Sequence, residues 1–108
     1  ANEQVRIYLE ESGFTVKNDL CLQCKSWTDI AKVDKEVMLS SLKKIDDDNI
    51  DALIQVGTNL PMASFIEEFE DSFDKPIIAI NSATYWDALR ENDIPDKIKG
   101  FGKLLSEY

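Results

Sequence analysis

The fold of this chain is decided by residues 51–80, which read DALIQVGTNLPMASFIEEFEDSFDKPIIAI. Two short apolar runs, at 52–56 and 76–80, form its ends, and turn-favouring residues flank each of them. Between the runs, apolar side chains recur at helical spacing: Met62, Phe65, Ile66, Phe69 and Phe73. The pattern predicts a strand covered on both faces, a helix with Pro61 in its first turn, and a second strand. Such a unit is a right-handed crossover, which predicts a parallel sheet.

The residues before this unit predict more helix and one more strand. Helical spacing of apolar side chains runs from Glu3 to Ser12 and ends at Gly13, where a left-handed residue can terminate a helix. Residues 14–17 alternate apolar with polar side chains, so they predict a first strand. Residues 18–33 have no clean period and are expected to be irregular.

Two further helices are expected on either side of the crossover. Asp34 is a suitable N-cap for a helix whose apolar stripe contains Met38, Leu42 and Ile45. Another helix is expected over residues 84–90, with Trp86 facing inward. Because the length of 108 residues is typical of one domain, we expect residues 1–108 to form a single three-layer α/β domain with a short parallel sheet flanked by helices.

The charge of the chain excludes several classes of partner. Its formal net charge is −9, and it has no cluster of Lys and Arg, so neither nucleic acid nor an anionic membrane surface is an expected partner. We find no long apolar run and no signal-like leader at Ala1. A cytoplasmic protein is the simplest expectation.

Histidine is absent, which removes the commonest general base and metal ligand. Cys21 and Cys24 have the spacing of a redox motif, but no further Cys exists to complete a zinc site, and two ordinary thiols are the favoured interpretation. The acidic runs 46–48 and 67–71 are interpreted as a turn and as the solvent face of a helix. No metal or cofactor is expected.

Two polar turns follow the predicted strands of the crossover. They are Gly57-Thr58-Asn59-Leu60 and Asn81-Ser82-Ala83-Thr84. In parallel sheets, ligands bind outside the carboxyl ends of the strands, where helix N-termini offer free N–H groups to anions. The sequence therefore predicts a carboxylate or phosphate site, although the same residues could simply cap two helices.

The same turns carry a resemblance to a known family. Residues 53–60 (LIQVGTNL) and 75–90 (KPIIAINSATYWDALR) resemble the C-terminal half of maleate cis–trans isomerases and arylmalonate decarboxylases, within the aspartate/glutamate racemase superfamily. Residues 5–16, the 33–42 helix and the ending 102–105 also resemble that half. The resemblance implies a flavodoxin-like half of a two-half enzyme, which isomerises, racemises or decarboxylates a small (di)carboxylate without cofactor.

The family motif has a cysteine where this chain has Gly57. By resemblance, Gly57, Thr58, Asn59 and Asn81 would bind the substrate carboxylate, and no residue of this chain would be catalytic at that position. A thiol would have to come from a missing N-terminal half, or the site would be completed by a second copy. The alternatives are a non-catalytic carboxylate-binding or regulatory module on the same fold, and a thiol–disulfide protein that uses Cys21 and Cys24.

Overall fold

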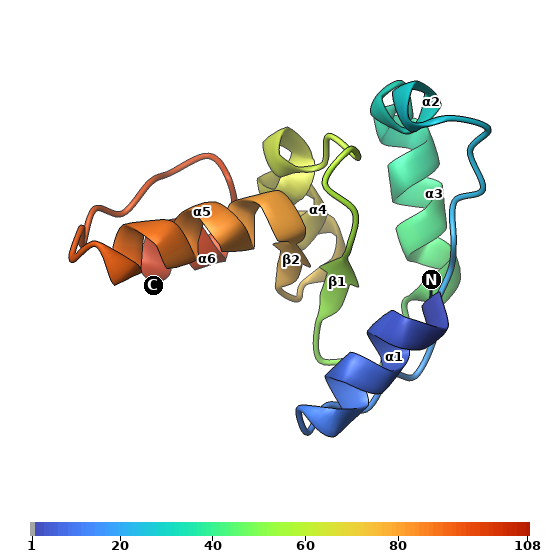
Figure 1. Ribbon diagram of the computed structural model, residues 1–108, viewed down its shortest axis with the longest axis horizontal. Coiled ribbons are helices and arrows are strands. Elements are labelled where there is room, and N and C mark those ends of the chain that lie inside the picture. Colours follow the sequence, from blue (N-terminus) through green and yellow to red (C-terminus); the bar gives the residue numbers. More distant parts are fainter. Residues whose placement is uncertain (1) are drawn as a thin grey trace.

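A two-stranded parallel sheet lies at the centre of the computed structural model, which describes residues 2–108 (Figure 1). Strand β1 (Leu53–Gln55) pairs with β2 (Ile77–Ala79), with Leu53 opposite Ile77 and Gln55 opposite Ala79. Between them the chain forms a short 3₁₀ helix, η1 (Ala63–Phe65), and helix α4 (Ile66–Phe73). The predicted strand–helix–strand crossover is confirmed.

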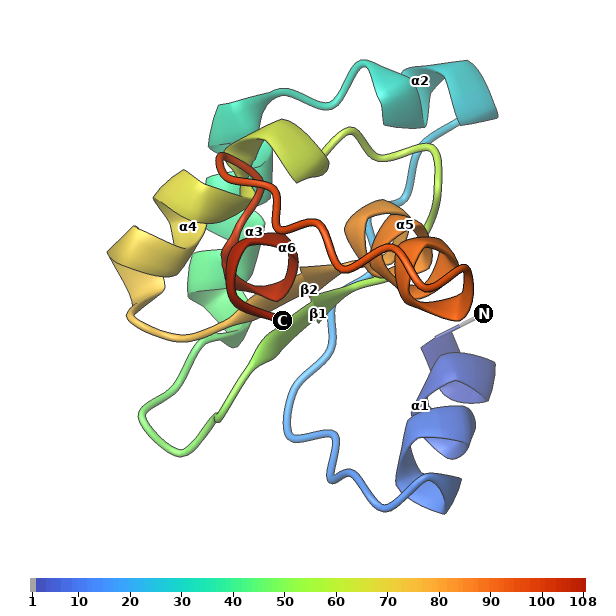
Figure 2. The ribbon, with the colours of Figure 1, turned by 90° about the vertical axis from the view of Figure 1, so that its left-hand side faces the viewer.

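Helices flank this small sheet. Those before β1 are α1 (Asn2–Glu11), α2 (Trp27–Ala31) and α3 (Lys35–Ile45), and those after β2 are α5 (Ile80–Glu91) and α6 (Lys103–Glu107). Figure 2 shows α3 and α4 on one side of the sheet and α1 on the other. The predicted fold class, a short parallel sheet flanked by helices, is therefore confirmed.

The core forms where α3, α4 and the sheet meet. Its largest fully buried side chains are Phe69, Met38, Ile66 and Ile77. Asp34 caps α3 as predicted, since its carboxylate accepts a hydrogen bond from Val37 N–H at 3.0 Å.

Residues 14–17 form no strand, contrary to the prediction. Their alternating pattern suits a strand, but a strand needs a hydrogen-bonded neighbour. Within residues 2–108, their only backbone–backbone bond is a terminating contact, in which Phe14 N–H donates to Leu9 O at 3.0 Å. Phe14 is accordingly exposed.

Strand β1 is covered on one face only, contrary to the prediction. Leu53 and Gln55 are buried on the side of α3 and α4, whereas the side chain of Ile54 is 43% exposed. The expectation fails because α1, which lies on the other side of the sheet, leaves Ile54 facing a cavity that Val5 and Leu9 also line.

Two helix boundaries also differ from the prediction. Pro61 lies outside the helix, because the buried side chains of Leu60 and Met62 hold the chain in an irregular turn and the first helical residue is Ala63. Helix α5 instead begins earlier, at Ile80, directly after the extended residue Ala79.

Two smaller corrections concern the irregular stretch and the acidic helix. Residues 18–33 contain the short helix α2, which Ser26 caps by accepting a hydrogen bond from Asp29 N–H. Glu70 is not on a solvent face. It is only 5% exposed, and its carboxylate accepts hydrogen bonds from Ile77 N–H (3.1 Å) and Lys103 N–H (2.8 Å).

No helix among residues 2–108 has the length and apolarity to cross a membrane.

Candidate functional site

The two polar turns predicted from the sequence lie side by side at the carboxyl ends of β1 and β2. Because the strands are parallel and in register, Gly57-Thr58-Asn59 and Asn81 leave the sheet at the same edge. The side-chain amide Nδ2 of Asn81 donates a hydrogen bond to the carbonyl oxygen of Thr58 at 3.0 Å. This bond joins Thr58 and Asn81 into one surface, and both residues are exposed on it.

The buried side chain of Gln55 supports the turn at residues 57–60 through a hydrogen bond. The Gln55 amide Nε2 donates to Gly57 O at 2.8 Å, and Leu60 N–H reaches the same carbonyl at 3.4 Å. Gln55 is only 7% exposed, and its Oε1 atom has no hydrogen-bond partner among the described residues. A polar residue at an inward position of an apolar strand is the sequence signal that could have identified this support.

Gly57 has a backbone conformation that suits glycine alone. Its φ is +118°, in the region that side chains with a Cβ rarely adopt. A Cβ at this position would still have room, because its nearest neighbour would be Gln55 Nε2 at 3.8 Å. The glycine is therefore favoured by the backbone conformation and not by crowding.

Backbone N–H groups are the donors that this surface offers. Within residues 2–108, the N–H groups of Gly57, Thr58 and Asn59 make no backbone hydrogen bond. Asn81 lies in the first turn of α5, where N–H groups have no intrahelical acceptor, and Ala79 provides no side-chain cap. Two segments therefore carry N–H groups without a backbone acceptor among the described residues at one edge of the sheet.

The electrostatics of the two turns differ from those of the whole chain. Although the net charge is −9, no charged residue occurs in 52–66 or in 76–86. The N-terminus of α5 also carries the positive end of the helix dipole, and no acidic residue lies in its first turn. A small anion would thus meet helix and turn donors on two segments that carry no carboxylate of their own.

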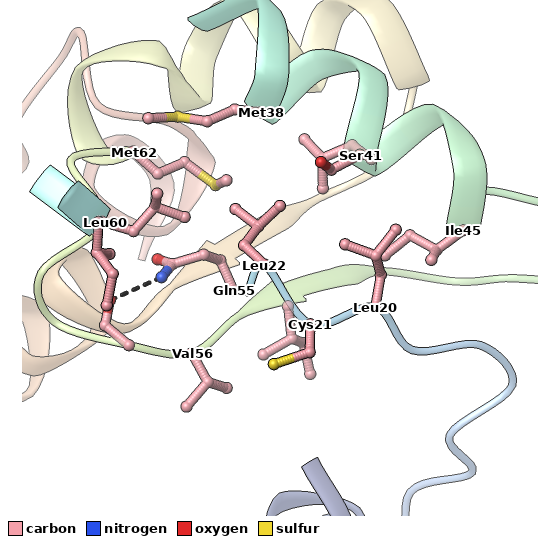
Figure 3. A pocket seen from close by; sticks show the side chains of 14 residues that line it. Leu20, Cys21, Leu22, Met38, Ser41, Ile45, Gln55, Val56, Leu60 and Met62 are labelled. Carbon is pink, nitrogen blue, oxygen red and sulfur yellow. Dashed lines mark hydrogen bonds between the residues drawn. The ribbon is translucent and has the colours of Figure 1, made fainter. Parts of the chain in front are cut away.

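A cavity of about 220 Å³ opens beside the turn, between α3 and β1 (Figure 3). Most of its lining is apolar, including Leu22, Met38 and Leu60. Cys21 lines the cavity together with Gly57, and no sequence pattern indicated that these two residues would line one cavity. Cys21 is exposed and Cys24 is half-buried, and both are free thiols.

The other residues singled out from the sequence differ in their exposure to solvent. The side chain of Asn59 is exposed and makes no hydrogen bond with another described residue. Ser82 is buried, so it does not belong to the exposed surface, and its Oγ atom has no partner among residues 2–108. Trp86 is half-buried as expected, whereas Tyr85 is 52% exposed. No group of three or more Cys, Asp or Glu in the described chain could hold a metal ion.

Comparison with known proteins gives the same fold and a consistent set of relatives. Maleate isomerase from Nocardia farcinica is 28% identical over 106 residues, which cover 97% of this chain and 42% of that protein. The structure of that enzyme with a covalently bound succinylcysteine intermediate superimposes with a TM-score of 0.92, covering 99% of this chain and 44% of the other. An arylmalonate decarboxylase structure, at 21% identity, shares the fold with a TM-score of 0.85.

The chain spans less than half the length of these relatives. A sequence model of the arylmalonate decarboxylase family matches residues 1–105, nearly the whole chain. The chain therefore belongs to the arylmalonate decarboxylase family, and maleate isomerases are among the proteins that it resembles.

Proposed function

We propose that this chain is one half of a cofactor-independent enzyme that isomerises, racemises or decarboxylates a small (di)carboxylate. The proposal assigns carboxylate binding to Gly57, Thr58, Asn59 and Asn81. The observation that carries it is the hydrogen bond from Asn81 to Thr58 O, since it unites two uncharged, donor-bearing turns into one surface. Family membership and the names of the relatives support isomerisation and decarboxylation among these reaction classes.

The chemistry of the surface suits a carboxylate better than a neutral ligand. Backbone N–H groups of the 57–59 turn and of the first turn of α5 would donate to the carboxylate oxygens, together with the Thr58 hydroxyl and the Asn59 amide. Hydrogen bonds to a charged group are worth about 1.5–3 kcal/mol each. Two such side-chain bonds would account for a change in affinity of roughly a hundredfold or more.

The acid–base step needs a group that Gly57 does not have. A thiol can remove or return a proton at carbon, whereas glycine offers only its backbone. We assign this step to a cysteine at a position other than residue 57, supplied by the other half of the enzyme or by a second copy of the chain. Light scattering of the purified chain distinguishes a lone monomer from such a pair.

Binding of maleate or of a malonate tests the carboxylate assignment. Replacing Thr58 and Asn59 together with Ala should weaken binding by roughly a hundredfold or more in isothermal titration calorimetry of the intact protein. Ser64→Ala is the matched control, because Ser64 is exposed on the same connecting segment but lies in η1, outside the turn. Equal affinities for the double variant and the control would refute the assignment.

A non-catalytic carboxylate-binding module is the second candidate, and the absence of a thiol at residue 57 favours it. Gly57→Cys separates the two candidates when proton exchange at the α-carbon of a bound acid is followed by NMR. Exchange in the natural protein supports the enzyme. Exchange in the Cys variant alone supports a module that retains a competent scaffold.

A further inference from the structure

The carbonyl group of Gly57 is fixed by two hydrogen-bond donors. The Gln55 amide Nε2 donates to its oxygen at 2.8 Å, and Leu60 N–H donates at 3.4 Å. Gln55 lies on the inward face of β1, where it is paired in register with Ala79 and is only 7% exposed. Figure 3 shows this bond between the buried amide and the turn. The Gly57 carbonyl therefore points into the protein.

The direction of the Gly57 carbonyl also sets the direction of the Thr58 N–H group. Both groups belong to one planar peptide unit, and no peptide bond in the described chain is cis. In a trans peptide unit the C=O and N–H bonds point in opposite directions. Because Gly57 O is turned inward to Gln55, Thr58 N–H points outward, and no backbone group among residues 2–108 accepts from it.

Asn81 fixes the next peptide unit in the same way. Its Nδ2 donates to Thr58 O at 3.0 Å, so Asn59 N–H points away from that amide. Neither Thr58 nor Asn59 has a positive φ, which excludes turns of types II, I′ and II′ and leaves the common type I. The first central residue of a type I turn is right-handed helical, so the N–H groups of Thr58 and Asn59 point the same way, as they do at the start of a helix. Two side-chain amides thus aim two neighbouring donors.

The side chain of Gln55 has a cost that packing does not explain. Its Oε1 atom is buried and has no hydrogen-bond partner among residues 2–108. Its surroundings are apolar, since Met38, Leu60 and Met62 line the same cavity. An unpaired buried carbonyl oxygen destabilises a protein, and an apolar side chain of similar size would avoid this cost. Departures from local rules of this kind are expected at functional sites.

We propose that Gln55 is a positioning residue of the carboxylate site, which holds Gly57 O so that Thr58 N–H is aimed at the ligand before binding. The inference rests on the proposed function and assigns a role to a residue that would not itself touch the ligand. Donors that are already oriented need no rearrangement when an anion arrives, which favours tight binding. Asn81 acts in the same manner through Thr58 O.

Gln55→Met tests this role, because methionine has a similar length and flexibility but no N–H group to donate. We expect maleate or malonate binding to weaken by roughly tenfold in isothermal titration calorimetry of the intact protein, which corresponds to the loss of one hydrogen bond to a charged group. Stability in urea denaturation should be unchanged or higher, because the unpaired Oε1 atom is removed and Leu60 N–H still donates to Gly57 O. A merely structural residue would lose stability and affinity together.

Leu53→Met is the matched control. Leu53 is buried on the same face of β1 as Gln55, and it lies two residues further from the turn. Exchange of leucine for methionine conserves volume, so the fold should tolerate it. The control carries the same new side chain in the same strand, and its affinity for maleate should equal that of the natural protein.

The orientation of Thr58 N–H can be measured without any ligand. Residual dipolar couplings of the natural protein in a weakly aligned sample should place the N–H vectors of Thr58 and Asn59 in the same direction, with Thr58 N–H pointing away from Gln55. In Gln55→Met the coupling of Thr58 should change beyond experimental error, whereas the couplings of α3 should not.

The two measurements separate a failure of this inference from a failure of the proposed function. If the natural protein binds neither maleate nor a malonate, the proposed function fails and the carboxylate role of Gln55 fails with it, whereas a changed Thr58 coupling still shows that Gln55 orients the donor. Unchanged affinity or an unchanged Thr58 coupling in folded Gln55→Met would overturn the positioning role. If that variant does not fold, couplings that place Thr58 N–H toward Gln55 in the natural protein would overturn it.

Discussion

Replacement of Gly57 by alanine isolates the backbone requirement of the candidate site. At φ +118°, a residue with a Cβ is strained by about 1–3 kcal/mol. The added methyl group would be only in ordinary contact, 3.8 Å from Gln55 Nε2, so crowding contributes nothing. The smaller entropy of the unfolded alanine chain offsets about 0.4–1 kcal/mol of the strain. We expect Gly57→Ala to lower the free energy of unfolding by about 1–2 kcal/mol.

Urea denaturation followed by tryptophan fluorescence measures this change, and two other glycines calibrate it. Gly13 has a φ of +96°, and an added Cβ there would meet nothing within 4 Å, so Gly13→Ala should cost about as much as Gly57→Ala. Gly102 has the same φ, but a Cβ there would collide with Ile66 and the Glu70 carboxylate, so Gly102→Ala should cost about 2–5 kcal/mol. A neutral or stabilising Gly57→Ala would refute the positive φ of the turn and the reason given for the glycine.

Further substitutions test the parts of the fold that support the site. Glu70→Ala leaves the N–H groups of Ile77 and Lys103 unpaired and should lower stability by about 2–4 kcal/mol in urea denaturation, with Glu70→Gln losing less because it can still accept. Phe69→Ala empties a fully buried site and should cost about 3–5 kcal/mol by the same measurement, whereas Phe69→Leu should cost clearly less. Asp34→Ala removes the cap of α3 and should cost about 1 kcal/mol in thermal unfolding followed by circular dichroism, and Asp34→Asn should retain most of the stability. Asn81→Ala removes the bond to Thr58 O and should weaken maleate binding in calorimetry with little loss of stability, since the bond is exposed; unchanged affinity would contradict the role given to Asn81.

Local patterns predicted the elements whose stability is local. The apolar stripe of α3 and its Asp34 cap depend on residues within a few positions of each other, and both are confirmed. The β1–α4–β2 crossover was also predicted, because two apolar runs around one amphipathic helix leave few other arrangements. The sequence did not predict which strands find a hydrogen-bonded neighbour. Residues 14–17 have the pattern of a strand but lack such a neighbour among residues 2–108.

For the candidate site too, the sequence identified the residues with local signals and missed those that depend on distant contacts. The sequence identified Gly57, Thr58, Asn59 and Asn81 from their positions after apolar runs and from the family resemblance, and their binding role stays a prediction. It did not show that Cys21 and Gly57 line the same cavity, because the two residues are far apart in the chain. Nor did it show that Gln55 supports the turn, since the bond depends on which face of a strand points inward.

The sequence by itself determined the order of α1, α3, β1, α4, β2 and α5, the parallel sheet and the uncharged turn residues, since periodicity and turn chemistry act over short distances. Only the tertiary structure decided the hydrogen bond between Asn81 and Thr58 and the burial of Glu70 between Ile77 and Lys103. The physical reason is that these features depend on donors and acceptors that the fold brings together from distant positions in the sequence. A local sequence pattern does not specify such long-range hydrogen bonds.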